Sequence, residues 1–289
     1  MQEDRYVDHS LMRLIAKQSA LVESVVDLQR SHDSLNASLA AMEQSNDEWY
    51  RRIEQLLVDI SSWQRCFKDC QDYRSHGLGH TNRIITTPGG SAGACNQETY
   101  CDMETDGGGW TVFQRHQSDD VNFTRNWADY KHGFGHVNGD FWWGNDKLTR
   151  ALNDGRQYEL RIDMLDRLGY VHRYAKYSYF NVAPESDNYR LSISGYTGEN
   201  TFGDSFGSSA NGQQFSTFDR DNDAHLSLNC AAAFGGRGGF WWGGCGGFAP
   251  NGRVSPTGRL SPFTCLYWEN PRGGNYVMKS VSMMYRAIN

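Results

Sequence analysis

The strongest constraint on the fold comes from residues 7–67, which contain neither glycine nor proline. Their apolar residues advance by alternating steps of three and four over about eight heptads, which is the pattern of helices that supercoil around one another. The seam positions are, in order, Leu11, Leu14, Gln18, Leu21, Val25, Leu28, His32, Leu35, Leu39, Met42, Asn46, Trp49, Ile53, Leu56, Ile60, Trp63 and Phe67. Segment 1–67 is therefore predicted to be a coiled coil that assembles a homo-oligomer. The alternative is one helix packed on its own globular domain.

The number of helices in this coiled coil stays open. Val25 and Ile53 occupy a positions, and β-branched residues there favour a dimer when leucine occupies d. Three polar a residues, Gln18, His32 and Asn46, can fix the register and the oligomeric state at some cost in stability. The glutamine, histidine and tryptophan residues of the seam weaken the preference for a dimer. A trimer therefore remains an alternative to the dimer.

The composition changes beyond the heptads. Glycine, asparagine, aspartate and aromatic residues become frequent, and residues 158–165, 175–180 and 189–196 alternate like half-buried strands. Residues 145–152 have the pattern of a short helix. Aromatic residues form 13% of the chain, enough for a substantial core. Residues 68–289 are therefore predicted to form one globular α+β domain.

Charge and hydropathy exclude several classes of partner. The formal net charge of −6 gives no indication of the basic surface that binding to a nucleic acid requires. No apolar run approaches the roughly 18 residues that indicate a membrane span. Residues 1–10 are polar and contain no signal-peptide core, so we expect that a signal was removed or that the chain is a fragment.

Other features indicate a secreted, extracellular protein. Asn36 and Asn122 begin N-glycosylation sequons, although such triplets also arise by chance. Asn36 falls at an e position of the heptads, beside the seam. The seven cysteines do not follow zinc-site spacing and are typical of disulfide partners, which implies an oxidising compartment. Because seven is odd, at least one cysteine is a thiol or joins another chain.

A short acidic loop, residues 215–223, carries aspartates at alternate positions: Asp219, Asp221 and Asp223. Alternate carboxylates in a loop direct several oxygens to one point, as a hard cation such as Ca²⁺ requires. An EF-hand is excluded, since a loop that starts at Asp219 or Asp221 lacks glycine at position six and glutamate at position twelve. The remaining alternative to a metal site is a solvated acidic turn.

Five ordered stretches resemble the fibrinogen C-terminal domain family, which includes ficolins, tachylectins, tenascins and angiopoietins. They are, in order, YCDM with GGWTVFQR (100–115); VNF, NW, YK and GFG (121–135); NGDFW with GN (138–145); YELR with YAKY (158–177); and FSTFDRDND, NCA, FWW and Cys245 (215–245). The similarity extends from Cys70 to the C-terminus, and a preceding coiled coil is common in this family. It implies an α+β fold with a mixed, antiparallel-rich sheet and a loop-rich C-terminal part.

The resemblance also implies two disulfides, Cys70–Cys101 and Cys230–Cys245. The second closes a loop of about 15 residues, and the chain-entropy model predicts that such a bond stabilises the folded state by roughly 3 kcal/mol. Cys66, Cys95 and Cys265 are left over. Cys66 is a candidate for linking neighbouring chains, and Cys95 with Cys265 is a candidate pair that the sequence does not decide.

A calcium site is implied in the acidic loop. By the family pattern its ligands are the side chains of Asp221 and Asp223 and the backbone carbonyls of His225 and Ser227. The spacing from Asp223 to Cys230 is longer than usual, which puts Ser227 in doubt. Asp219 is expected to form hydrogen bonds within the loop. Extracellular Ca²⁺ modules bind in the range of about 10⁻⁴–10⁻³ M, and this ion would be structural.

Lectin members of the family bind acetyl groups in an aromatic pocket next to the calcium. By the resemblance, Phe234, Gly244, Cys245, Gly246 and Phe263 line the corresponding site, with a cis Gly244–Cys245 bond. The chain departs from the pattern because Gly246 replaces a histidine and Phe234 lacks a tyrosine hydroxyl. Phe263, in a Pro-Phe pair, aligns with a Tyr-Ala pair. We expect these changes to weaken acetyl recognition.

Two functions follow from these observations. The first is an oligomeric, calcium-dependent lectin, of innate-immune type, for glycans or acetylated surface groups. The second is an extracellular protein–protein module, as in matrix, clotting or receptor-ligand members, without sugar binding. An enzyme is not expected, because no GxSxG, HExxH, Walker or dinucleotide motif occurs.

Overall fold

The computed structural model describes residues 3–63, 66–89, 94–198, 203–233, 236–254, 264–269 and 275–288. It divides into two compact units, Met1–Arg65 and Cys66–Asn289. Within the described residues, no helix combines the length and the apolar character needed to cross a membrane.

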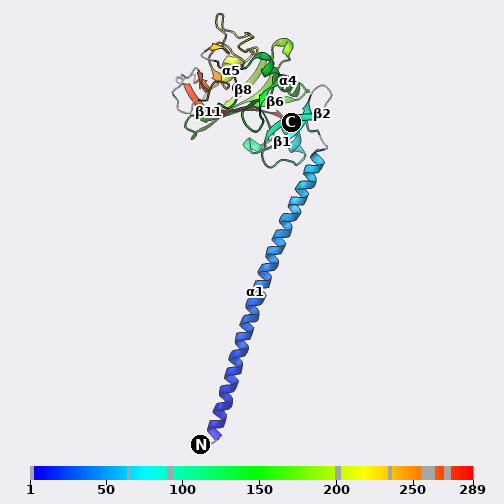
Figure 1. Cartoon of the computed structure of the whole chain (residues 1–289), viewed down its shortest axis with the longest axis vertical. Helices are drawn as coiled ribbons and strands as arrows, with labels where there is room; N and C mark the ends of the chain where they lie inside the picture. The colour runs from blue at the N-terminus through cyan, green and yellow to red at the C-terminus, as the bar shows by residue number, and fades with distance from the viewer. Residues whose placement is uncertain are drawn as a thin grey trace. The chain divides into compact units, whose positions relative to one another are not determined.

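The first unit is a single helix, α1 (Glu3–Trp63) (Figure 1). Apart from the half-buried Ile53, the apolar seam side chains of α1 that are described are exposed; for example, Leu28 and Leu35 at d positions are each 70% accessible. A long amphipathic helix gains most of its stability from covering its apolar stripe. Within one chain the stripe of α1 lies open to solvent, the state expected of a coiled-coil strand that lacks its partners.

The end of the predicted repeat differs from the structure. Phe67, the last predicted seam residue, follows the end of α1 and is only 3% exposed. It packs edge-on against Tyr73, with ring centroids 5.0 Å apart, in a small core with the Cys70–Cys101 disulfide. The aromatic side chain is thus buried in the globular unit, so the helical repeat ends before it.

The second unit is built on an antiparallel sheet with the strand order β1-β2-β3-β11-β6-β7-β8 (Figure 1). The main strands are β1 (Arg83–Gly89), β2 (Ala94–Asp102), β3 (Trp110–His116), β6 (Gln157–Asp166), β7 (His172–Val182), β8 (Leu191–Gly198) and β11 (Asn275–Ile288). The short strands are β4 (Phe134–Gly135), β5 (Phe141–Trp142), β9 (Phe248–Ala249) and β10 (Tyr267–Glu269). The ladders between these strands are all antiparallel. The predicted α+β class and its antiparallel-rich sheet are confirmed.

The last strand of the chain lies at the centre of this sheet. β11 pairs with β3 through Val281–His116 and with β6 over ten residues, from Met278–Asp166 to Ile288–Gln157. The central strand therefore joins segments that are far apart in sequence.

Short helices complete the globular unit: α2 (Cys70–Ser75), α3 (Trp127–His132), α4 (Asn145–Leu152) and α5 (Ser205–Ala210), with 3₁₀ turns at Thr105–Gly107 and Glu185–Asp187. Asp69 caps α2 by accepting a hydrogen bond from the Asp72 N–H at 2.8 Å, and Asn126 caps α3 in the same way. The core is unusually aromatic, since Trp110, Trp142 and Trp268 are all essentially inaccessible.

Three disulfides stabilise the unit: Cys66–Cys95, Cys70–Cys101 and Cys230–Cys245. The first corrects two expectations, because Cys66 bonds within its own chain and Cys95 does not pair with Cys265. Cys95 lies in β2, and its Cα is 5.5 Å from that of Cys66. Cys265 is a buried thiol outside the three disulfides.

Candidate functional site

The acidic loop is fixed at its beginning by the aromatic core. Phe215, Ser216 and Thr217 are fully buried, and Ser216 exchanges two backbone hydrogen bonds with Phe240 at 2.9 and 3.0 Å. Thr217 closes a tight turn by pairing with Arg220. The aspartates that follow therefore extend from a buried, hydrogen-bonded segment.

Asp219 is used by the fold itself. Its Oδ1 accepts hydrogen bonds from the Thr217 hydroxyl at 2.7 Å and from the Trp127 backbone N–H at 2.9 Å. These bonds tie the loop to the first residue of α3. Asp221 and Asp223 remain as the acidic pair of the loop.

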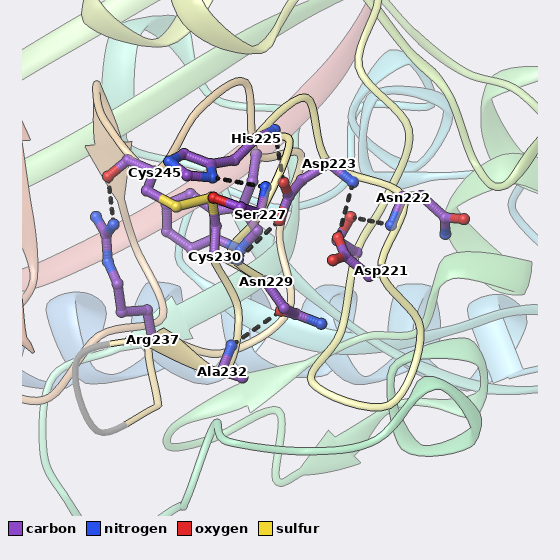
Figure 2. The surroundings of a disulfide bond; sticks show 12 residues. Asp221, Asn222, Asp223, His225, Ser227, Asn229, Cys230, Ala232, Arg237 and Cys245 are labelled. Atoms are coloured by element: carbon purple, nitrogen blue, oxygen red, sulfur yellow. Dashed lines mark hydrogen bonds between the residues drawn. A yellow bond between two sulfur atoms is a disulfide. The ribbon is translucent and has the colours of Figure 1, made fainter.

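Asp221 and Asp223 lie next to each other (Figure 2). The Asp221 Oδ1 accepts a hydrogen bond from the Asp223 N–H at 3.3 Å. Asp223 in turn accepts from the His225 N–H at 2.8 Å and from the Cys230 N–H at 2.7 Å. Burial raises the pKa of Asp223, and the charge of Asp221 raises it further. A bound cation would relieve this repulsion.

The donor set of the loop fits a hard cation. Asp221 and Asp223 offer carboxylate oxygens, and two exposed residues, His225 and Ser227, follow with their backbone carbonyls. The His225 ring does not point to a soft-metal site, because its Nδ1 accepts a hydrogen bond from the Ser227 N–H at 3.3 Å. Nowhere in the described part of the chain do three or more His, Cys, Asp or Glu side chains gather as a metal cluster. A metal here would need backbone or water oxygens to complete its shell, as Ca²⁺ accepts.

The Cys230–Cys245 disulfide connects the acidic loop to a second loop (Figure 2). The expectation of a cis Gly244–Cys245 bond is wrong, because every peptide bond between described residues is trans. The chain turns instead through left-handed backbone angles, with φ of 61° at Cys245 and 86° at Gly247. Such a conformation is costly for a residue with a side chain, so the surroundings of Cys245 must hold it.

Arg237 provides that restraint. Its guanidinium is fully buried and donates to the Cys245 carbonyl (Figure 2). It also donates to the Tyr267 hydroxyl. It also lies 4.4 Å from the ring centroid of Trp242 and 5.0 Å from that of Tyr267. The Tyr267 hydroxyl donates to the same carbonyl at 3.3 Å. The planar guanidinium presents several N–H donors in a fixed geometry, which suits simultaneous hydrogen bonds to a carbonyl and a hydroxyl oxygen.

Sequence reasoning missed this role of Arg237. The available signal was a charged residue between two glycine pairs, Gly235-Gly236 and Gly238-Gly239, directly before an aromatic run. Gly238 has a φ of 75°, and a Cβ there would lie 2.8–2.9 Å from neighbouring atoms. The glycines thus allow the backbone close enough to bury the arginine.

A cavity of 520 Å³ opens beside Cys245. Gly244 and Gly246, two of the predicted ligand-binding residues, line it together with Gly243 and Gly247. Cys245 itself is 9% exposed. The other two predicted residues, Phe234 and Phe263, lie outside the residues that the structure describes.

The other residues that line this cavity are polar. Ser205, Ser208 and Ser209 of α5 line it, together with Gln213 and Glu269. The Glu269 carboxylate is oriented by the Gly247 N–H, which donates to its Oε2 at 2.7 Å. This part of the cavity is not an aromatic cage. Its hydroxyl, amide and carboxylate groups instead suit a ligand rich in hydrogen-bonding groups.

The tryptophans next to the site are structural. Trp241 donates to the Tyr189 carbonyl at 2.7 Å and Trp242 to the Gly238 carbonyl at 3.2 Å, and both are 1% exposed. The two sequon asparagines, Asn36 and Asn122, are both exposed. Asn122 accepts a hydrogen bond from the Thr124 N–H at 2.8 Å.

Comparison with known proteins gives a consistent result. Residues 66–288 match the family described as "Fibrinogen beta and gamma chains, C-terminal globular domain". Angiopoietin-2 of Sus scrofa is 31% identical over 96% of this chain, and Ryncolin-4 of Cerberus rynchops is 40% identical over 76%. A solved lamprey fibrin D-dimer, complexed with the peptide Gly-His-Arg-Pro-amide, is 29% identical with a TM-score of 0.61. That alignment covers 94% of this chain and 93% of the fibrin chain.

The chain spans little more than half the length of the two curated relatives. It matches 56% of the length of Angiopoietin-2 and 61% of Ryncolin-4.

Proposed function

The chain belongs to the fibrinogen C-terminal domain family, a family of non-enzymatic ligand-binding proteins, and from this premise we propose that it is a secreted, oligomeric, calcium-dependent lectin. Its ligands are glycans or acetylated groups on surfaces. The observation that carries the proposal is the polar cavity bordered by Gly244 and Gly246. Serine hydroxyls, Gln213 and Glu269 supply hydrogen-bonding groups of the kind that recognise sugar hydroxyls and amides.

Calcium has a structural role in this proposal. Asp221 and Asp223 would hold it through their carboxylates, and His225 and Ser227 through their carbonyls. The ion would neutralise two neighbouring carboxylates and so stabilise the acidic loop. Because the Cys230–Cys245 disulfide connects this loop to the cavity wall, the ligand site would depend on the ion.

The exposed seam of α1 supports the oligomer. Single sugar contacts are weak, and joining several domains raises the apparent affinity by about 10²–10⁴ without a new contact. The coiled coil would thus make a modest pocket effective on a surface that repeats its ligand.

The second candidate function is an extracellular protein–protein module. The lamprey fibrin structure holds a peptide ligand, and Angiopoietin-2 aligns along nearly the whole chain. In this alternative the same loop surface binds a polypeptide and no sugar.

Retention on N-acetylated and non-acetylated resins, with calcium and then with chelator, tests the proposal. Selective retention that chelator abolishes supports the lectin. Absence of retention, from folded protein that still binds calcium, refutes sugar recognition and favours the protein–protein module.

Calcium binding itself is tested by the double variant Asp221→Ala, Asp223→Ala. At 10 mM calcium and a Kd of about 10⁻⁴–10⁻³ M, binding stabilises the native state by about 1.4–2.7 kcal/mol. This corresponds to a rise in Tm of about 3–10 °C for the native chain, which the variant should lose. The control Glu43→Ala, Asp47→Ala removes two exposed helix carboxylates and should keep the shift. An unchanged shift in the loop variant would reject the site.

A further inference from the structure

A second cavity lies far along the sequence from the acidic loop. It measures 250 Å³, and residues of α4 and β1 contribute to its lining. Trp143, Pro88 and Ala151 give it apolar walls. The Trp143 indole is held in place because its Nε1 donates to the Glu98 carbonyl of β2 at 3.0 Å.

Four cationic side chains surround this cavity: Lys68, Lys147, Arg150 and Arg156. Lys147 and Arg150 are three residues apart on one face of α4, the spacing at which like charges repel. Lys147 also lies in the first turn of the helix, where the helix dipole disfavours a cation. Burial lowers the pKa of Lys147, and the charge of Arg150 lowers it further. The arrangement is unfavourable without an anion.

The available carboxylates are already engaged. Asp154 and Asp69 both bind Arg156, at 2.6 and 2.7 Å from its Nη2. Among the described residues, no carboxylate lies within ion-pair distance of Lys68, Lys147 or Arg150. Arg156 is therefore a fixed part of the wall, and three cations remain for a ligand.

This local excess of positive charge is not a general property of the chain, whose net charge is −6. A cavity that combines an apolar wall with a few placed polar groups is typical of a small-ligand site. Its volume is below the roughly 300–1,000 Å³ of pockets for drug-sized ligands, so one ring with its substituents fills it. Ammonium and guanidinium groups bind sulfate and carboxylate through charge-assisted hydrogen bonds.

We propose that this cavity binds an acidic sugar, a ring that carries a sulfate or carboxylate group. The ring lies against Trp143 and Pro88, and its anionic group meets Lys147, Arg150 and Lys68. This site is separate from the acidic loop and needs no calcium.

Isothermal titration of the full chain with a sulfated, uronate-containing disaccharide tests the proposal. Its non-sulfated counterpart distinguishes sulfate from carboxylate as the recognised group. We expect binding that chelator leaves unchanged and that Lys147→Met weakens about tenfold, since one charge-assisted bond is lost. The double variant Lys147→Met, Arg150→Met should bind no disaccharide.

The matched control is Lys279→Met, which removes an exposed lysine of β11 and should change the Kd less than about twofold. Circular dichroism checks that each variant is folded. Equal weakening by Lys147→Met and Lys279→Met would mean diffuse electrostatic attraction and would overturn the proposal. It would also be overturned if neither disaccharide bound, if inorganic sulfate bound as tightly, or if an acidic tetrapeptide bound as tightly. Because binding here is independent of calcium, failure of this site and failure of the proposed lectin are distinguishable.

Discussion

Replacing Arg237 with methionine tests whether a buried cation holds the wall of the candidate pocket. The change removes hydrogen bonds to the Cys245 carbonyl and the Tyr267 hydroxyl, and the contact with the Trp242 ring at 4.4 Å. Charge-assisted hydrogen bonds are worth about 1.5–3 kcal/mol each, and a desolvated cation–π contact about 2 kcal/mol. These losses are partly offset because folding of the variant no longer removes a charge from water, which costs several kcal/mol in the wild type.

Methionine keeps most of the volume, and Tyr267 still donates to the Cys245 carbonyl at 3.3 Å. We therefore expect a net loss of about 2–3 kcal/mol in the free energy of unfolding. For a unit of this size that loss lowers Tm by about 4–12 °C. Urea unfolding of the full chain, followed by tryptophan fluorescence, measures the loss directly. Retention on the acetylated resin should fall with it, because Cys245 would lose its restraint.

The control is Arg253→Met, whose side chain is 61% exposed and lies 4.0 Å from Asp119. It should change the free energy of unfolding by less than about 0.5 kcal/mol. Arg237→Lys should fall between the wild type and Arg237→Met, because an ammonium group keeps the charge but not the planar fork. If Arg237→Met were as stable as the control, or more stable than wild type, the assigned role would be wrong.

The other predictions concern the acidic loop, the cavity and the helix. Because its pKa is raised in the fold, Asp223 contributes stability that is present at low pH and is lost as the pH rises through that pKa. Without calcium at pH 7, Asp221→Asn should relieve the repulsion between the two carboxylates and be more stable than the wild type by a few tenths of a kcal/mol. With calcium, the same variant should be less stable than the wild type. The opposite order of stabilities in urea unfolding would refute this coupling. Gly246→His is compatible with the backbone and has only the Glu269 carboxylate nearby, at 3.2 Å from its Cβ; it should increase retention on acetylated resin, and no gain would mean that other walls are missing. Leu28→Glu places a charge in the exposed seam and should yield monomers in sedimentation velocity, whereas an unchanged oligomer would refute the coiled coil.

The sequence by itself determined the elements that rest on local periodicity. Heptads predicted the long helix, although the predicted repeat extended to Phe67 and α1 ends at Trp63. Period-two alternation predicted strands that the structure places at β6, β7 and β8. The ordered motifs predicted the family and the α+β class, both of which the comparisons confirm. The helix and the strands could be predicted because their periodicities depend on residues a few positions apart.

Only the tertiary structure decided which distant residues meet. Cys66 and Cys95 form a disulfide across a sequence separation of 29, and no spacing rule predicts it. The burial of Arg237 depends on Tyr267, thirty positions away, and on a trans turn at Cys245. The cationic cavity likewise joins α4 to β1, about sixty positions apart in sequence. Proximity in space depends on how the whole sheet closes, and the local pattern of a sequence does not contain that information.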